Sequence, residues 1–229
     1  MKNIGRHTLQ VMKTASWYND WIFSIIEPFL GEEILEIGAG IGVFTEMLAR
    51  RGVVTAIDID RSYLKKLKGI EGERIKLGFG DIEKGKYYFK NSKFDSVVCL
   101  NVLEHIGDEK RALKNMIDLL RVNGKLILLV PAHGLLFSKF DERLGHYRRY
   151  LRKDVKNMLE DLGFAEIEVF YFNWLAAIGW LIFVKIGKKE MIPSDKVSYF
   201  NRFGKVFLWP EKFIHPPFGL SVIAVANKK

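Results

Sequence analysis

The stretch from Ile34 to Thr45, ILEIGAGIGVFT, constrains the fold more than any other part of the chain. A short apolar run ends at Glu36, three alternating glycines follow, and an amphipathic segment then begins, which is the pattern of a strand, a tight turn and the start of a helix. Glycine tolerates positive φ and has no side chain, so this turn lets the backbone approach a ligand closely. The free N–H groups at the start of the helix would face that ligand. We therefore expect a small ligand at the carboxyl end of the first strand.

The spacing of the glycines argues against a dinucleotide as that ligand. The dinucleotide fingerprint G-x-G-x-x-G would place its third glycine at position 43, where the chain has Val43. The glycines are instead Gly38, Gly40 and Gly42, and Glu36 stands two residues before the first of them. A carboxylate in this place would repel a pyrophosphate but would suit an ammonium or a sulfonium.

Polar residues also follow the next three strand-like runs. The second run, VVTAID, ends at Asp58, and an acid in this place accepts hydrogen bonds from ribose hydroxyls. The third run leads into Asp81, and the fourth, FDSVVCL, is followed by N-V-L-E-H from Asn101 to His105.

These four motifs, in this order, resemble the class I S-adenosylmethionine-dependent methyltransferases. The resemblance is strongest to the broad small-molecule group, which has an E-x-G-x-G-x-G turn and a V-L-E-H segment, and it spans about residues 32–163, with a weaker match at 219–229. It implies a Rossmann-like fold, S-adenosylmethionine as cofactor and methyl transfer to a small molecule. It also implies a set of cofactor-binding residues: Glu36, Gly38 and Gly40 for the methionine and ribose, Asp58 for the ribose hydroxyls, Ile59 and Ile82 beside the adenine, Asp81 for its amino group, and Asn101 for the methionine end through its backbone.

Strand and helix patterns alternate along the chain and predict an α/β fold, a seven-stranded, mostly parallel sheet with helices on both faces. The expected helices are 17–30, 43–51, 61–68, 108–121 and 151–162. We expect one methyltransferase domain whose parts are an N-terminal helical cap (1–31), a cofactor-binding core (32–172), an aromatic-rich insertion between strands six and seven (173–217) and the last strand (218–229).

The polar segment 131–150 leaves the fifth strand on the side where ligands bind. Long polar loops on a rigid scaffold are where catalytic residues concentrate. Histidine has a pKa near neutrality, so His133 and His146 are predicted as catalytic bases for O-methylation. Arg143, Tyr147 and Arg148 are predicted to bind the substrate, together with Trp174 from the next segment. The alternative is structural: Arg148 and Arg149 cover the following helix, Tyr147 packs and Asp141 caps a turn.

The insertion 173–217 exceeds what the cofactor fold needs. It opens with WLAAIGWLIFV, which is too short to cross a membrane. Three interpretations stay open: a lid over an apolar substrate, an interfacial membrane-bound helix, or ordinary core beneath the helix 17–30. With the basic residues Arg143, Arg148 and Lys185 nearby in the expected fold, a lid would suit an amphiphilic, aromatic or lipid-linked acid.

Composition narrows the partners. The net charge is +9, but the lysines are dispersed, and neither an arginine–aromatic platform nor a zinc-ligand spacing is present. We therefore expect a small-molecule substrate, no nucleic acid and no metal. Cys99 is the only cysteine, which rules out a disulfide within the chain. The first residues lack the apolar core of a signal peptide, so the expected location is cytoplasmic, with peripheral contact to a membrane as the alternative.

The sequence leaves two rival functions open. One is an NAD-dependent oxidoreductase, against which Val43 and the V-L-E-H segment argue. The other is a non-catalytic methyltransferase-like binding protein, against which the three acids Glu36, Asp58 and Asp81 argue, since a degenerate site has no need of all of them.

Overall fold

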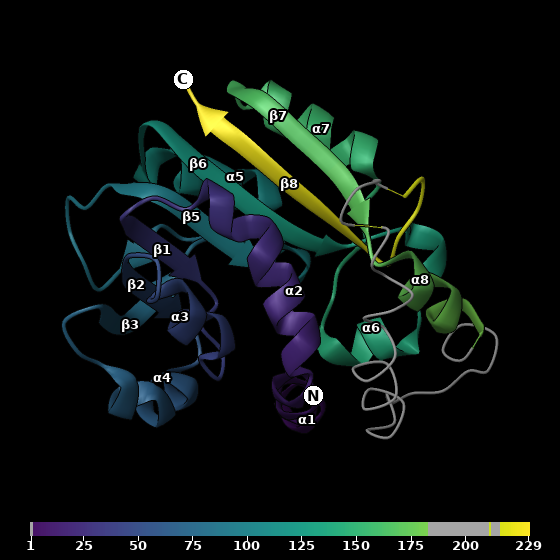
Figure 1. Cartoon of the computed structure of the whole chain (residues 1–229), viewed down its shortest axis with the longest axis horizontal. Coiled ribbons are helices and arrows are strands. Elements are labelled where there is room, and N and C mark those ends of the chain that lie inside the picture. The colour runs from purple at the N-terminus through teal and green to yellow at the C-terminus, as the bar shows by residue number, and fades with distance from the viewer. Residues whose placement is uncertain (1, 183–210, 212–215) are drawn as a thin grey trace.

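The computed structural model describes residues 2–182, 211 and 216–229, which build one eight-stranded sheet with helices on both faces (Figure 1). In chain order the strands are β1 Glu33–Ile37, β2 Val53–Asp58, β3 Ile75–Asp81, β4 Lys86–Tyr87, β5 Phe94–Leu100, β6 Leu120–Pro131, β7 Phe164–Phe172 and β8 Ser221–Lys228. The α-helices are α1 Lys2–Thr14, α2 Ser16–Ile26, α3 Val43–Leu48, α4 Arg61–Leu67, α5 Glu109–Leu119, α6 Lys139–Leu144, α7 Arg152–Asp161 and α8 Trp174–Trp180.

The strands lie in the order β4-β3-β2-β1-β5-β6-β8-β7. Five neighbouring strands are parallel, namely β3, β2, β1, β5 and β6. Strand β8 pairs antiparallel with both β6 and β7. The predicted mostly parallel sheet is confirmed, but the predicted count of seven strands is wrong by one. The additional strand is β4, which pairs antiparallel with the end of β3 and is too short to show an alternating apolar pattern.

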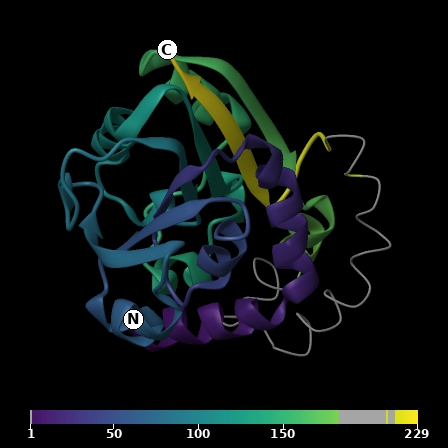
Figure 2. The ribbon, with the colours of Figure 1, turned by 60° about the vertical axis from the view of Figure 1, so that its left-hand side comes forward.

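Helices α2, α3 and α4 cover one face of the sheet, and α5 and α7 cover the other (Figures 1 and 2). Ile26 of α2 and Leu48 of α3 are buried against the first face. Met116 of α5 and Leu159 of α7 are buried against the second. Because both faces are covered, the ligand-binding edge is formed by the loops that follow the parallel strands.

The N-terminal segment differs from the single helix predicted at 17–30. The structure has α1, then α2, then a 3₁₀ turn at Glu27–Phe29. Pro28 in that turn ends α2 because proline offers no N–H to the helix. The side-chain amide of Asn19 donates to the carbonyl of Met12 at 2.9 Å and so ties the end of α1 to α2.

The predicted insertion begins with α8. The side chain of Asn173 caps this helix by accepting the N–H of Ala176 at 3.1 Å. The Glu211 carboxylate accepts the backbone N–H groups of Asn173 and Trp174, each at 2.8 Å. The indole N–H of Trp180 donates to the carbonyl of Leu136 at 3.1 Å, so α8 packs on the loop after β6.

Residues 183–210 and 212–215 of the insertion lie outside the described residues, so the lid, membrane and core interpretations remain predictions there. Among the helices that are described, none is both long and apolar enough to span a membrane.

Candidate active site

The glycine turn follows β1 as the sequence predicts. All three glycines have positive φ, +81° at Gly38, +54° at Gly40 and +83° at Gly42, a conformation that L side chains rarely adopt. A Cβ placed on Gly38 would lie 2.3 Å from Cγ2 of Val102, which is the second residue after β5. The absence of side chains is therefore a steric requirement of the turn, and it leaves bare backbone at the carboxyl edge of the sheet.

Asp58, at the end of β2, joins this turn to the next loop. Its Oδ2 accepts the N–H of Gly40 at 2.8 Å, and its Oδ1 accepts the N–H of Asp60 at 2.7 Å. Burial raises the pKa of the Asp58 carboxyl, while the two N–H donors act in the opposite direction. A carboxylate has about four lone-pair sites, so Asp58 retains acceptor capacity for a ligand. The neighbouring Ile59 is 64% exposed and presents an apolar surface there.

Glu36 is buried in β1 just before the turn. The hydroxyl of Thr45 donates to its Oε2 at 2.5 Å. Burial raises the pKa of Glu36 to about 7, the Thr45 hydrogen bond opposes this, and the nearby Asp58 adds to the rise.

The other predicted cofactor residues lie at the ends of the neighbouring strands. Asp81 accepts the N–H of Lys84 at 3.0 Å and is 3.6 Å from its ammonium. Ile82 is buried in the core, whereas the Asn101 side chain is exposed. The backbone of Asn101 has φ of +53°, and its N–H donates to the carbonyl of Leu129 at 2.8 Å. The structure thus brings together, along one edge, the loops that carry all the predicted cofactor residues.

Comparison with known proteins agrees with this arrangement. Residues 35–128 match a family described as a methyltransferase domain. The ubiquinone biosynthesis O-methyltransferase of Coxiella burnetii is 33% identical over 101 residues, which cover 42% of this chain and 42% of that protein. The mitochondrial ubiquinone biosynthesis O-methyltransferase of Schizosaccharomyces pombe is 30% identical over 115 residues, 47% of this chain and 41% of that protein. Over residues 35–128 the chain therefore has a methyltransferase domain. The match spans less than half the length of these curated relatives.

Solved structures show the same fold for the methyltransferase domain. A methyltransferase from Thermotoga maritima superimposes with a TM-score of 0.67 at 16% identity, covering 100% of this chain and 96% of that one. Phosphoethanolamine N-methyltransferase 2 of Haemonchus contortus, in complex with S-adenosylmethionine, gives 0.62 at 19% identity, covering 91% and 52%.

The residues of the methyltransferase domain fit its cofactor, S-adenosylmethionine. The turn has no room for a side chain at Gly38, and neither Gly38 nor Gly40 carries one. Three carboxyl groups, Glu36, Asp58 and Asp81, follow one another along the edge, and they match a cofactor that carries a sulfonium, ribose hydroxyls and an amino group. The assignment of each residue to one part of the cofactor remains a proposal.

Glu104 lies in the turn that follows β5 and is 1% exposed. Its Oε2 is buried and has no hydrogen-bond partner within the described part of the chain. Burial raises the pKa of Glu104 to about 8, with Arg149 lowering it and Asp141 raising it further. Glu104 was part of the V-L-E-H motif but was not predicted as a site residue.

Two imidazoles lie beside Glu104. The rings of His105 and His146 meet edge to face with centroids 4.5 Å apart, and one ligand atom from each of the three side chains lies within 4.8 Å of the others. His105 is in part exposed to solvent. Burial of its ring, and then the charge of His146, lower the pKa of His105 to about 4. Such a cluster can accept protons or hold a metal ion, although the sequence predicted no metal.

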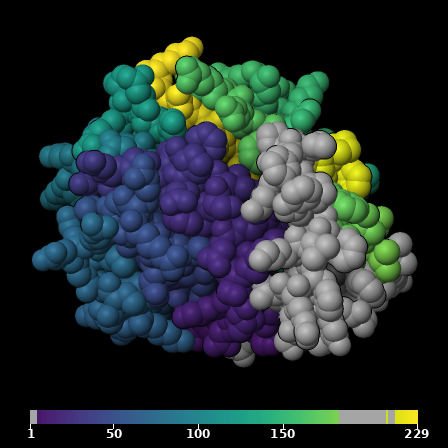
Figure 3. Space-filling view, in the orientation of Figure 1, coloured from purple at the N-terminus to yellow at the C-terminus, as the bar shows by residue number. Residues whose placement is uncertain are grey.

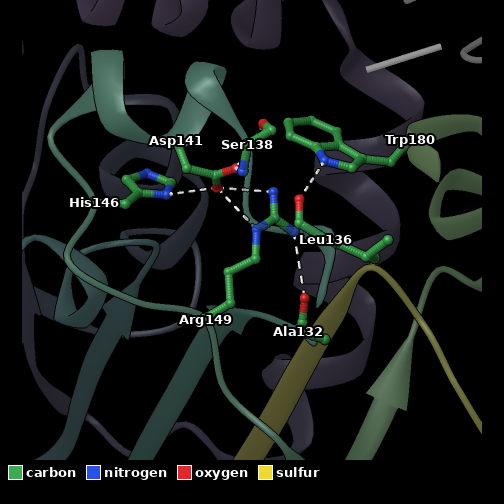
Figure 4. A network of polar contacts seen from close by, with 7 residues as sticks. All are labelled: Ala132, Leu136, Ser138, Asp141, His146, Arg149 and Trp180. Carbon is green, nitrogen blue, oxygen red and sulfur yellow. Dashed lines mark hydrogen bonds and ion pairs between the residues drawn. The ribbon is translucent and has the colours of Figure 1, made fainter. Parts of the chain in front are cut away.

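A buried ionic network holds His146 in place (Figure 4). Asp141, fully buried, accepts from Nδ1 of His146 at 3.1 Å and from the guanidinium of Arg149 at 2.8 Å. Its other oxygen accepts the N–H and the hydroxyl of Ser138, both at 2.9 Å. Burial alone would raise the pKa of Asp141, but the His146 hydrogen bond, the charge of Arg149 and the Ser138 bond together lower it. The Arg149 guanidinium also lies 4.6 Å from the ring centroid of Trp180.

His133, the second predicted base, lies apart from this cluster. Its ring stacks on Tyr171 with centroids 4.7 Å apart, and its Nε2 is buried with no partner among the residues described. Burial and then the positive charge of Arg149 lower the pKa of His133, which favours the neutral imidazole.

The predicted substrate residues lie in three different environments. Arg148 is paired with Glu109 at 2.9 Å and donates to the carbonyl of Gly107, so it braces the start of α5. Tyr147 is 63% exposed and Arg143 is exposed on α6, whereas Trp174 is partly buried where α8 packs near α2.

We expect Glu104→Gln to change how stability depends on pH. Because the folded-state pKa of Glu104 is raised from 4.5 to about 8, the stability contributed by its neutral form is complete below pH 4.5 and is lost as the pH rises through 8. Glutamine stays neutral, so the variant should become more stable relative to the parent between pH 5 and 9. Thermal unfolding across this range checks the prediction, and parallel curves would contradict it.

We expect Asp58→Ala to weaken binding of S-adenosylhomocysteine by about 2–3 kcal/mol, because charge-assisted hydrogen bonds to the ribose are lost. Calorimetry gives the affinity, and thermal unfolding of the same sample shows that the fold is retained. Glu46→Ala, which removes an exposed acid from α3, is the control and should bind normally. Unchanged affinity for the Asp58 variant would show that this residue only stabilises the turn.

Proposed function

We propose that the chain transfers the sulfonium methyl group of S-adenosylmethionine to a hydroxyl group of a small molecule. The observation that carries this proposal is the pairing of His146 with the buried Asp141, beside Glu104, next to the loop that follows β5. A histidine oriented by a carboxylate is a general base, and a hydroxyl nucleophile benefits from a base more than an amine does.

The chain's own residues then have three tasks in the reaction. When bound, the cofactor supplies a strongly electrophilic methyl group. The ionised Asp141 accepts the Nδ1–H of His146, which leaves Nε2 to take the proton of the substrate hydroxyl as its oxygen forms a bond to the methyl carbon and the carbon–sulfur bond breaks. The surrounding loop aligns the hydroxyl and excludes water. His133 is the second candidate for the base.

For the substrate we propose an amphiphilic, aromatic or lipid-linked molecule with an acidic group. The exposed Tyr147 and Arg143 and the aromatic start of the insertion support this class, as does the net charge of +9. The curated relatives are named for O-methylation in ubiquinone biosynthesis, which is consistent with it. We further propose a cytoplasmic location with peripheral contact to the membrane.

A transfer assay with methyl-labelled S-adenosylmethionine tests the proposal. The acceptors are phenols and catechols with a carboxylate, each with and without an apolar tail, and the matched anilines. We expect label on the hydroxyl compounds, with faster transfer to those that carry the tail. Label on amines alone would contradict O-methylation, and no transfer to any acceptor with intact cofactor binding would favour a non-catalytic role.

A further inference from the structure

Helix α1 crosses the carboxyl edge of the sheet instead of covering one of its faces. It runs from the side of α4 to α6, against which it packs (Figures 1 and 2). A Cβ placed on Gly40 would lie 3.7 Å from Cδ1 of Leu9, so this helix lies directly over the glycine turn. In the space-filling view the purple surface of the N-terminal helices continues into the blue surface on the α4 side (Figure 3).

Arg6 fastens α1 to α4. Its Nη2 donates to the hydroxyl of Ser62 at 2.8 Å, and its guanidinium lies 5.9 Å from the ring centroid of Tyr63. Both partners belong to the first turn of α4, which begins just after Asp58. The Nε–H of Arg6 is buried and has no acceptor within the described residues. A buried donor without an acceptor is costly, so this N–H favours a ligand that brings an oxygen.

We propose that Arg6 binds a ribose oxygen of the cofactor through its Nε–H, and that α1 thereby retains the cofactor in its site. The inference rests on the proposed cofactor-dependent function. The ribose hydroxyls donate to Asp58 and offer their lone pairs to Arg6, so the acid of β2 and the cation of α1 are complementary ligands for the same group. The cofactor's other strong acceptor is its amino-acid carboxylate, and the experiment separates the two.

The test is the dissociation rate of S-adenosylhomocysteine, measured by stopped flow. We expect Arg6→Ala to release it about tenfold faster or more. Arg6→Lys should release it nearly as fast as Arg6→Ala does, because lysine keeps the charge but lacks the Nε–H. Lys13→Ala removes an exposed cation from the same helix and should leave the rate unchanged. Amide hydrogen exchange of residues 5–14 should slow when the ligand binds the parent, and slow less in Arg6→Ala.

A second ligand identifies the group that Arg6 contacts. 5′-Methylthioadenosine keeps the ribose and lacks the amino-acid carboxylate, so Arg6→Ala should weaken its binding by the same factor as that of S-adenosylhomocysteine. An effect on S-adenosylhomocysteine alone would overturn the assignment to the ribose. Equal dissociation rates for the parent and Arg6→Ala would overturn the role of α1. Failure of the parent to bind either ligand would instead refute the proposed function.

Discussion

Asp141→Ala is expected to lower the free energy of unfolding by about 3–5 kcal/mol. The side chains of Asp141 and Arg149 are 0% and 2% exposed, and removing the acid leaves the buried guanidinium without its ion-pair partner. The change also removes the cap of α6, because Ser138 donates to the same carboxylate. Denaturant unfolding followed by circular dichroism measures this loss.

The matched control is Lys156→Ala, which breaks an exposed ion pair with Glu160 on α7 and should change stability by less than about 0.5 kcal/mol. Replacing Asp141 and Arg149 together by leucine and methionine should recover much of the loss, since an apolar pair leaves no buried charge. A loss for Asp141→Ala as small as that for Lys156→Ala would show that the network does not hold the loop.

His146→Ala is expected to lower turnover by roughly 10²-fold or more, while the affinity for S-adenosylhomocysteine stays nearly unchanged. The imidazole is the proposed proton acceptor, and the cofactor residues belong to other loops. Turnover is measured with the best acceptor from the labelling screen, and calorimetry gives the affinity. His146→Gln should show the same loss, since an amide fills the space without accepting the proton.

His133→Ala tests the second candidate in the same assay. A large loss for His133→Ala with normal turnover for His146→Ala would move the base to the loop beside Tyr171. Full turnover in both variants would mean that alignment of the substrate carries the reaction without a histidine base.

The sequence was sufficient to predict the loops at the carboxyl edge of the sheet that form the proposed cofactor site. Gly38, Gly40 and Asp58 belong to short contiguous motifs in which spacing determines the local backbone, so the structure confirms the turn and its strand-end acid. The two isoleucines predicted beside the adenine differ in burial: Ile59 is exposed, whereas Ile82 is 6% exposed and packs in the core. An apolar residue after a strand has the same sequence pattern in either role.

His146 was predicted on its own, but its grouping with Glu104 and His105 could not be, because that grouping depends on contacts between segments that are distant in the chain. Glu104 and His105 meet His146 only when the loop after β6 folds back, as the hydrogen bond from the Tyr147 N–H to the Glu104 carbonyl shows. The role of Asp141 as the central acceptor depends on the same folding. Within the N-terminal cap the sequence predicted a helix only at 17–30. Helix α1 is amphipathic, but its few apolar residues do not stand out among many polar ones.

Calorimetric titration of the purified chain tests the central claim, that this is an S-adenosylmethionine-dependent site. The motif spacing, the bare turn at Gly38 and Gly40 and the acids Asp58 and Asp81 predict micromolar binding of S-adenosylmethionine and S-adenosylhomocysteine, about 8 kcal/mol of binding free energy, and no comparable heat with NAD. Tight binding of NAD without a response to either sulfur ligand would contradict the account.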